Sequence, residues 1–382
     1  MKNSVIYMAM AAVALASCSK DETSEVNLGT PIEFRTAVGT RAETASTPIQ
    51  NCFMSAVDKD DKPVFSIQEF TDPDGDYTLT HAQGLQYYWP ADGSDVTFYA
   101  FTPTAVRSSH NETPEATIGP HTISNFIPNY PYTSNNVTSN ATQYDLMGAV
   151  ATGNKNSNGV TLTFKHLLSN IEIQAMSANT SYKFEVIGWR LANVKIKGSF
   201  DLTNQEAGWT FGETPELYTY TYRLSQSESI ELNDSYKVLH NFELTNTPWP
   251  IYMIPQQLTP WEPDKATTSQ GAYMALLVRI TSKTTGAVIY PTEAENAIQK
   301  AYDWVAVPLS TNWMVGKKYV YKLDFTNGAG NVAPDLDDPT QTPGGLRPGD
   351  QVLSNIKISF TVNEIDDWGN GDPNTGDSGI TM

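Results

Sequence analysis

The sequence predicts an all-β protein made of β-sandwich domains. Thr, Val, Ile, Tyr and Phe recur in short runs where apolar and polar residues alternate, a pattern typical of half-buried strands. Clusters of Gly, Asn, Asp and Pro separate these runs, as expected of turns. A helical pattern is scarce, and only residues 292–302 fit a short helix. Many short strands joined by turns favour sandwiches.

The strands of the first half are expected where the alternation is clearest. Ile32, Phe34 and Thr36 share one face of a first strand. Further strands of this half are expected at residues 51–57, 63–70 and 95–101. Residues 102–142, rich in Pro, Asn, Ser and Thr, are expected to form a long irregular excursion, a kind of loop that is usually functional or mobile.

The second half continues the meander and ends in an amphipathic strand. Its strands are expected at residues 160–164, 171–173, 184–196, 199–202, 249–254, 273–281 and 318–325. Residues 327–350 are expected to be a flexible linker. The strand predicted at 352–365 carries five apolar residues on one face: Val352, Ile356, Ile358, Phe360 and Val362.

The length of the chain suggests two domains, with three as the alternative. The glycine- and asparagine-rich stretch 153–159 is the best candidate for the boundary between them. The expected division is a signal peptide at 1–17, a surface tether at 18–26, an N-terminal β-sandwich at 27–155, a C-terminal β-sandwich at 156–368 and a polar, disordered tail at 369–382.

The N-terminus carries the features of an export signal. Lys2 is followed by an apolar stretch that is too short to span a bilayer, which needs about 20 apolar residues. The sequence Leu-Ala-Ser before Cys18 resembles the lipobox of bacterial lipoproteins, whose cysteine is acylated and becomes the new N-terminus. Residues 19–22, Ser-Lys-Asp-Glu, resemble a surface-export signal of lipoproteins. The alternative is an ordinary signal peptide with a chance cysteine.

The composition argues against nucleic acid as a partner and against an intrachain disulfide. The formal net charge is -18 and no basic cluster occurs, so nucleic acid is not an expected partner. If Cys18 carries lipid, Cys52 has no partner for a disulfide, and its apolar surroundings predict a buried, inert thiol.

No motif indicates a metal, a cofactor or catalysis. The acidic stretch from Asp72 lacks the Gly and Glu that an EF-hand loop needs at its sixth and twelfth positions, so it is predicted to be a turn. The five histidines are too widely spaced for a zinc pair. Neither a nucleophile elbow nor a phosphate loop is present. The aromatic residues are expected to fill the cores. Trp261 is the best candidate for an exposed ring in a sugar-binding platform, but packing in the core or against its loop is the favoured expectation for it too.

Several patterns, in order along the chain, resemble those of the fimbrillin (Mfa-like) family, the lipoprotein pilins of type V pili and related surface adhesins. They are Thr-Pro-Ile-Glu-Phe at 30–34 with Gly-Thr-Arg-Ala at 39–42, Tyr-Trp-Pro at 88–90 with 95–100, Asp-Leu-Met at 145–147 with 162–171, Met-Ile-Pro-Gln at 253–256, and Trp-Met-Val-Gly-Lys-Lys-Tyr-Val-Tyr at 313–321.

This resemblance implies two tandem transthyretin-like β-sandwich domains and assembly by strand exchange. It implies that an arginine-specific protease cuts after Arg41, removing a first strand whose Ile32 and Phe34 fill a groove until a strand of another subunit replaces it. The alternative for Arg41 is an exposed loop arginine; Arg35 is the weaker cleavage site because it lies within the strand. Strand 352–365 is either the donor or the last strand of the second sandwich.

The first hypothesis is therefore a non-enzymatic pilus subunit or pilus-associated adhesin. Its expected partners are other pilin subunits, an arginine-specific protease, the outer membrane through its lipid, and a ligand on a host or bacterial surface. The alternative is a monomeric surface lipoprotein that binds glycans or a host protein. A hydrolase is the third hypothesis, with no residues in its favour.

Overall fold

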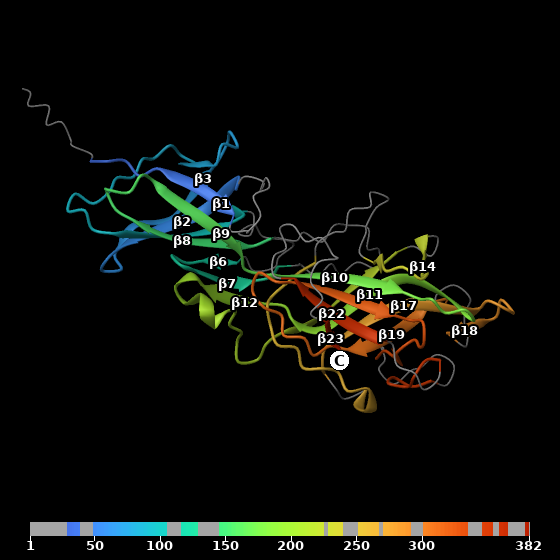
Figure 1. The fold of residues 1–382 in the computed structure, drawn as a ribbon. Coiled ribbons are helices and arrows are strands. Elements are labelled where there is room, and N and C mark those ends of the chain that lie inside the picture. The colour runs from blue at the N-terminus through green and yellow to red at the C-terminus, as the bar shows by residue number, and fades with distance from the viewer. Residues whose placement is uncertain are drawn as a thin grey trace, which may run out of the picture.

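The protein is all-β, as the sequence predicts (Figure 1). The computed structural model describes residues 29–38, 49–104, 116–128, 145–224, 228–239, 251–266, 270–291, 301–334, 346–353, 359–365 and 379–381. Strands and short 3₁₀ turns such as Leu202–Ala207 make up its regular structure. In these ranges no helix has the length and apolar character needed to cross a membrane. The segment 292–300, most of the expected helix, lies outside the described residues.

The N-terminal part of the chain forms one closed sheet. In order around the sheet its strands are β1 (Phe34–Val38), β4 (Thr78–His81), β3 (Pro63–Thr71), β2 (Asn51–Asp58), β5 (Val96–Thr102), β8 (Met147–Gly153) and β9 (Val160–His166), and β9 returns to pair with β1. Alternation places every second side chain inside, as in β9, where Val160, Leu162 and Phe164 are buried and Thr161 and Thr163 are exposed. The inward side chains form a separate hydrophobic core.

The stretch 154–159, the expected domain boundary, lies within this sheet. It connects β8 to β9, and Met147 of β8 pairs with His166 of β9. The chain leaves the closed sheet only after His166, where Leu167 and Leu168 lead into the next strand. We therefore propose a division after β9 rather than at 155/156. Composition alone cannot distinguish a hairpin loop from a linker, because both are rich in Gly and Asn.

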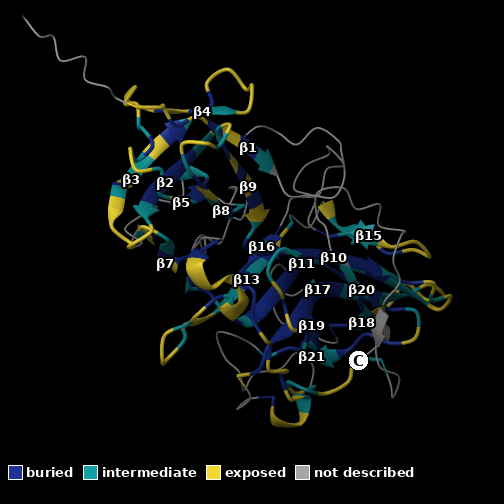
Figure 2. Ribbon diagram, turned by 60° about the vertical axis from the view of Figure 1, so that its left-hand side comes forward, coloured by how far each residue is buried: buried dark blue, intermediate teal, exposed yellow. Residues whose placement is uncertain are grey.

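Two further sheets pack face to face and form the larger part of the molecule. The first contains β10 (Ser169–Met176), β15 (Lys237–Val238), β16 (Ile251–Met253), β20 (Lys318–Asp324), β22 (Ser359–Ile365) and β23 (Gly379–Thr381). The second contains β11 (Tyr182–Lys195), β13 (Leu217–Arg223), β14 (Ile230–Glu231), β17 (Tyr273–Ser282), β18 (Val288–Tyr290), β19 (Asp303–Pro308) and β21 (Asn331–Val332). Their facing side chains, such as Ile171, Leu276 and Tyr321, are fully buried in one core, and Figure 2 shows the central strands in the buried colour.

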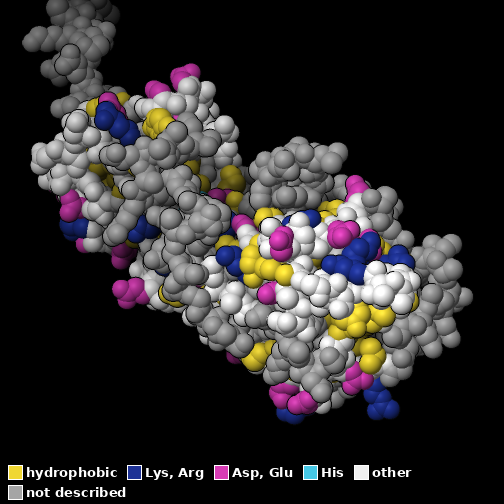
Figure 3. Space-filling view, turned by 45° about the vertical axis from the view of Figure 1, so that its right-hand side comes forward, with side chains coloured by type: hydrophobic (Ala, Val, Ile, Leu, Met, Phe, Trp, Pro, Cys, Tyr) yellow, Lys and Arg dark blue, Asp and Glu magenta, His cyan; other side chains and the backbone are white. Residues whose placement is uncertain are grey.

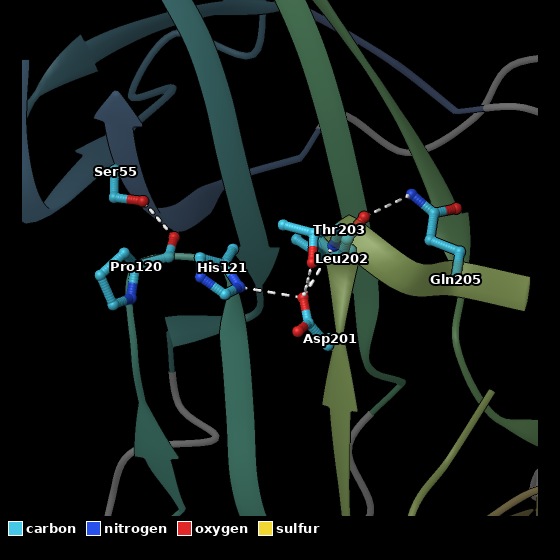
Figure 4. A network of polar contacts seen from close by, with 7 residues as sticks. All are labelled: Ser55, Pro120, His121, Asp201, Leu202, Thr203 and Gln205. Carbon is cyan, nitrogen blue, oxygen red and sulfur yellow. Dashed lines mark hydrogen bonds and ion pairs between the residues drawn. The ribbon is translucent and has the colours of Figure 1, made fainter. Parts of the chain in front are cut away.

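A small sheet joins the closed sheet to the sandwich. It consists of β6 (Thr117–Ile118), β7 (Thr122–Phe126) and β12 (Gly198–Asp201). The described part of the excursion 102–142 is therefore partly regular, which corrects the expectation of an irregular loop. Figure 4 shows the polar contacts: Ser55 of β2 donates to the carbonyl of Pro120, and His121 Nδ1 lies 2.9 Å from Asp201 Oδ1.

Acidification is expected to weaken this small sheet. Partial burial tends to raise the pKa of Asp201, but hydrogen bonds from Thr203 and His121 outweigh it, so the pKa lies below its ordinary value. A carboxyl whose pKa is lower in the folded state stabilises that state above its unfolded pKa of about 3.9, and this contribution is lost as the pH falls toward the folded pKa. Calorimetric scans below about pH 5 should show a shallower fall in Tm for Asp201→Asn than for the wild type. Equal slopes would contradict the role of Asp201.

Two segments that the sequence predicts to be flexible pack against the sheets in their described parts. Ala329 and Val332 of the expected linker are buried, and Val332 accepts a hydrogen bond from Gly349. Near the end of the polar tail, β23 pairs with β22, with Ile380 opposite Val362. Both expectations are wrong for these residues, because short strands take their order from a partner strand rather than from their own composition.

Candidate functional site

Strand β1 closes the N-terminal sheet by pairing on both sides. On one side it runs parallel to β9 over five residue pairs, from Phe34 opposite Val160 to Val38 opposite Phe164. On the other side it is antiparallel to β4 over only two pairs, Phe34–Leu79 and Arg35–Thr78. The shorter ladder makes the β1–β4 side the weaker of the two sides of β1, and we call it the seam.

The inward side chains of β1 and the residue before it complete the core of the closed sheet. Ile32, Phe34 and Thr36 are all buried, which confirms that they share one face. The ring of Phe34 contacts the rings of Phe70 and Phe98 edge to face, each at 5.2 Å between centroids. Removing this segment would uncover these rings and the inward residues of β9.

The acidic turn before β4 holds the end of β1. The Asp72 carboxylate, which is buried, accepts hydrogen bonds from the backbone N–H groups of Gly75, Asp76 and Tyr77. The carbonyl of Tyr77 in turn accepts a hydrogen bond of 2.9 Å from the N–H of Thr36. The acidic stretch therefore forms a turn, as we predicted from its lack of the Gly and Glu that an EF-hand loop needs.

Of the two candidate cleavage residues, only Arg35 lies within the described residues. Arg35 lies within β1, where its backbone is paired with Thr78 and Thr161, and a protease needs an unpaired extended segment. Arg41 lies outside the described residues, in the stretch between Val38 and Ile49. Cys18 also lies outside the described residues.

The predicted strand 352–365 is only partly a strand in the described residues. β22 begins at Ser359 and pairs with β20 over seven residues, with Val362 opposite Tyr321. Phe360 and Val362 face the core, and the ring of Phe360 stacks on that of Tyr321 at 5.6 Å. Val352 is buried but pairs elsewhere, donating to the carbonyl of Gly330. Ile356 and Ile358 lie outside the described residues. In this conformation β22 occupies the position of a strand of the chain's own second sandwich.

A pocket of about 460 Å³ opens at the seam, between β1 and the segment that follows β4. One wall consists of residues 32–35, and the other of residues 78–81 and 84–87. The pocket exists because the chain turns away from β1 at His81–Gly84 and returns to it at Tyr87, whose carbonyl accepts a hydrogen bond from Ile32. Sequence reasoning missed this pocket, since alternation predicts the faces of a strand and not where two strands part.

Cys52 and Trp261 are both buried. Cys52 is completely buried, as predicted, and burial raises the pKa of its thiol far above the ordinary value. Trp261, the best candidate for an exposed ring, is only 1% exposed, which confirms the favoured expectation that it packs against the protein: its backbone N–H bonds to Ala272 and its ring contacts Tyr273 at 5.4 Å. The flanking prolines made exposure the alternative, but the loop folds back onto the sandwich.

The described surface offers no other concentrated site. Within the described ranges, no three metal-ligating side chains are grouped. The exposed large hydrophobic residues of the described ranges include one that lines the seam pocket, Leu85; the others are Tyr77, Val150, Leu217, Tyr236, Val288 and Met314. On the face drawn in Figure 3, the coloured hydrophobic side chains form small groups among polar and charged ones. The seam beside β1 is therefore the candidate functional site.

Comparisons with known proteins identify one family. A sequence model described as fimbrillin-like matches residues 38–338 of the chain. Among solved structures, a protein from Bacteroides ovatus named for cell adhesion shares 13% identity and a TM-score of 0.46, covering 90% of this chain and 99% of its own. A protein named for cell adhesion from Parabacteroides distasonis shares 9% identity and a TM-score of 0.49, with coverage of 90% and 99%.

A fimbrial protein is also similar in structure. The fimbrial anchor protein Mfa2 from Porphyromonas gingivalis shares 9% identity with this chain and a TM-score of 0.34, covering 88% of this chain and 96% of its own. No curated protein matches the sequence.

Proposed function

The chain belongs to the fimbrillin-like family, and from this membership we propose that it is a pilus subunit or pilus-associated adhesin that assembles by β-strand exchange. The family is structural rather than enzymatic, in agreement with the absence of a catalytic motif in the sequence. Membership supports a location at the cell surface or in a fimbrium. Lipidation, cleavage after an arginine and strand exchange are parts of our proposal.

The observation that carries strand exchange is the position of β1. This five-residue strand closes the sheet, its inward side chains belong to the core, and the segment that contains Arg41 follows it directly. Loss of β1 would leave β9 with an unpaired backbone edge beside buried aromatic rings. An exposed edge of this kind is a template for an incoming strand, which supplies hydrogen bonds and side chains for the vacated pockets.

The other parts of the proposal come from the sequence. Acylation of Cys18 would attach the protein to the outer membrane, and residues 18–26 would be the tether. An arginine-specific protease would cut after Arg41 and release the strand with Ile32 and Phe34. The donated strand would be 352–365, which contains Phe360 and Val362 and also Ile356 and Ile358, two residues outside the described ranges. Donation would require β22 to leave β20.

The alternative function is a monomeric surface lipoprotein that binds a glycan or a host protein. The seam pocket favours it, since a concave site with an apolar floor and a polar rim is the usual form of a ligand site. The two functions differ in what cleavage does: strand exchange needs the release of β1, whereas a monomeric receptor does not.

Digestion with an arginine-specific protease tests the proposal. The protein, produced without lipid, should be cut after Arg41, lose the segment with β1 and form higher oligomers on size-exclusion chromatography. Mass spectrometry identifies the cut. Arg41→Ala should block cleavage and oligomer growth, while Arg35→Ala, as the matched control, should leave both unchanged. A cut after Arg41 that leaves a stable monomer would favour the alternative function.

A further inference from the structure

We propose that the seam pocket binds a neutral sugar, and that the bound sugar holds β1 in the sheet. The second part rests on the proposed function, because retention of β1 matters only if its release leads to assembly. The pocket volume of about 460 Å³ falls within the range of about 300–1,000 Å³ usual for small-ligand sites.

The floor of the pocket is apolar and aromatic. Phe34 and Phe70 line it and are buried, whereas Tyr87 is half-buried. The ring of Tyr87 stacks on that of Phe65, with 4.2 Å between centroids, and this contact fixes its orientation. A fixed aromatic ring offers the apolar surface on which the C–H face of a sugar packs, and the tyrosine hydroxyl adds a polar end.

The rim of the pocket is polar. Thr80, Gln86 and Arg35 are exposed and line it, which places hydroxyl, amide and guanidinium groups around the apolar floor. The Gln86 side-chain amide donates to the carbonyl of Ile32, so its position depends on the backbone next to β1. Hydroxyl groups of a sugar match such a rim because each both donates and accepts hydrogen bonds.

The charges of the lining favour a neutral ligand. Glu33 and Arg35 have opposite signs and lie two residues apart. The ring of His81 is engaged within the protein: its Nδ1 accepts hydrogen bonds from the N–H groups of Gln83 and Leu85, and its Nε2 lies 3.1 Å from Gln68 Oε1. With one carboxylate and one guanidinium, and with both nitrogens of His81 bonded to other groups of the protein, the lining offers no excess of positive charge for an acidic sugar.

Binding in this pocket would stabilise β1 in its place. Residues 32–35 form one wall, so the site is complete only while β1 is in the sheet. A ligand that binds one state alone stabilises it by the factor 1 + [L]/Kd. At a concentration of about 100 Kd, the population with β1 released falls about 100-fold. The pocket would thus couple capture of a sugar to retention of the unassembled form.

Titration calorimetry with the full-length, unlipidated chain tests binding. The probes are galactose, mannose, N-acetylglucosamine and lactose, with sialyllactose as the acidic comparison and a leucine-rich tripeptide as the apolar one. Thr80→Trp fills the pocket and should weaken binding of the neutral sugar at least about tenfold. Thr161→Trp is the control, because Thr161 lies on β9, on the other side of β1, and outside the pocket. If Thr80→Trp fails to fold, Gln86→Ala, which removes one rim amide, takes its place.

Three outcomes would overturn binding of a neutral sugar at this site: no neutral sugar binds, the pocket variants bind as the wild type does, or only sialyllactose or the tripeptide binds. Hydrogen exchange then tests the coupling at the Ile32 and Thr36 amides, which donate across the seam to Tyr87 and Tyr77. At about 100 Kd of sugar their exchange should slow by up to about 100-fold. Unchanged exchange would overturn retention of β1.

Failure of sugar binding and failure of strand exchange give different experimental results. If cleavage after Arg41 produces oligomers but no sugar binds, the pocket proposal alone fails. If sugar binds at the pocket but cleavage leaves a monomer, strand exchange fails and the site remains.

Discussion

Replacing Phe34 by alanine is expected to destabilise the N-terminal closed sheet by about 3–5 kcal/mol. Phe34 is 3% exposed and contacts two aromatic rings, so its removal leaves a cavity between large side chains of the core. The loss also weakens the hold on β1 itself, because Phe34 is the largest side chain that this strand contributes. Guanidinium unfolding, followed by tryptophan fluorescence, measures the change.

The control is the neighbouring residue on the opposite face. Glu33 precedes Phe34 and is exposed, and its carbonyl still accepts from Val160 in the variant Glu33→Ala. This variant should change the free energy of unfolding by less than about 0.5 kcal/mol. If Phe34→Ala is as stable as Glu33→Ala, β1 is not an integral part of the core, and its release would not open the groove that strand exchange requires.

The alternation of the sequence predicted most of the long strands. The inward residues of β5 and β9 follow from period-two patterns that a half-buried strand must have, because side chains point to opposite faces in turn. β17 instead begins with a continuous apolar run that is buried on both faces. The buried face of β1 was also correct. These features are local, so the sequence of one strand is enough to reveal them.

Strand partners could not be predicted in the same way. The parallel pairing of β1 with β9 joins residues more than 120 positions apart, and nothing in either strand specifies it. The two- and three-residue strands β6, β21 and β23 take their conformation from a neighbouring strand. The seam pocket was missed for this reason too, since it depends on where β4 leaves β1.

The sequence favoured a packed Trp261 but could not show what covers it. Trp261 follows Pro260 in a segment that reads as an exposed loop, yet the loop folds onto the outer face of β17. The backbone of Pro260 bridges to Ala272, and the indole N–H reaches the carbonyl of Ala266. A proline-rich composition predicts irregular backbone, but it does not predict which side chains of that backbone are covered.

Replacing Val362 by aspartate is expected to destabilise the sandwich by more than about 3 kcal/mol, or to detach β22 from β20. Val362 is 2% exposed and lies opposite Tyr321 in the core. A carboxylate at this position would lose its hydration without gaining a cation, a cost that exceeds the loss of the apolar contact. Hydrogen exchange of the amides in β20 and β22 would show the detachment directly.

Thr361→Asp is the matched control because Thr361 precedes Val362 and is partly exposed on the opposite face of the strand. It adds the same charge to the same strand and should change the free energy of unfolding by less than about 1 kcal/mol. If Val362→Asp behaves like Thr361→Asp, β22 contributes little to its own sandwich, and a donor strand that leaves readily becomes the better description. If it unfolds the sandwich, donation carries the cost of taking β22 out of a packed sheet, and assembly needs an acceptor groove that returns at least as much free energy.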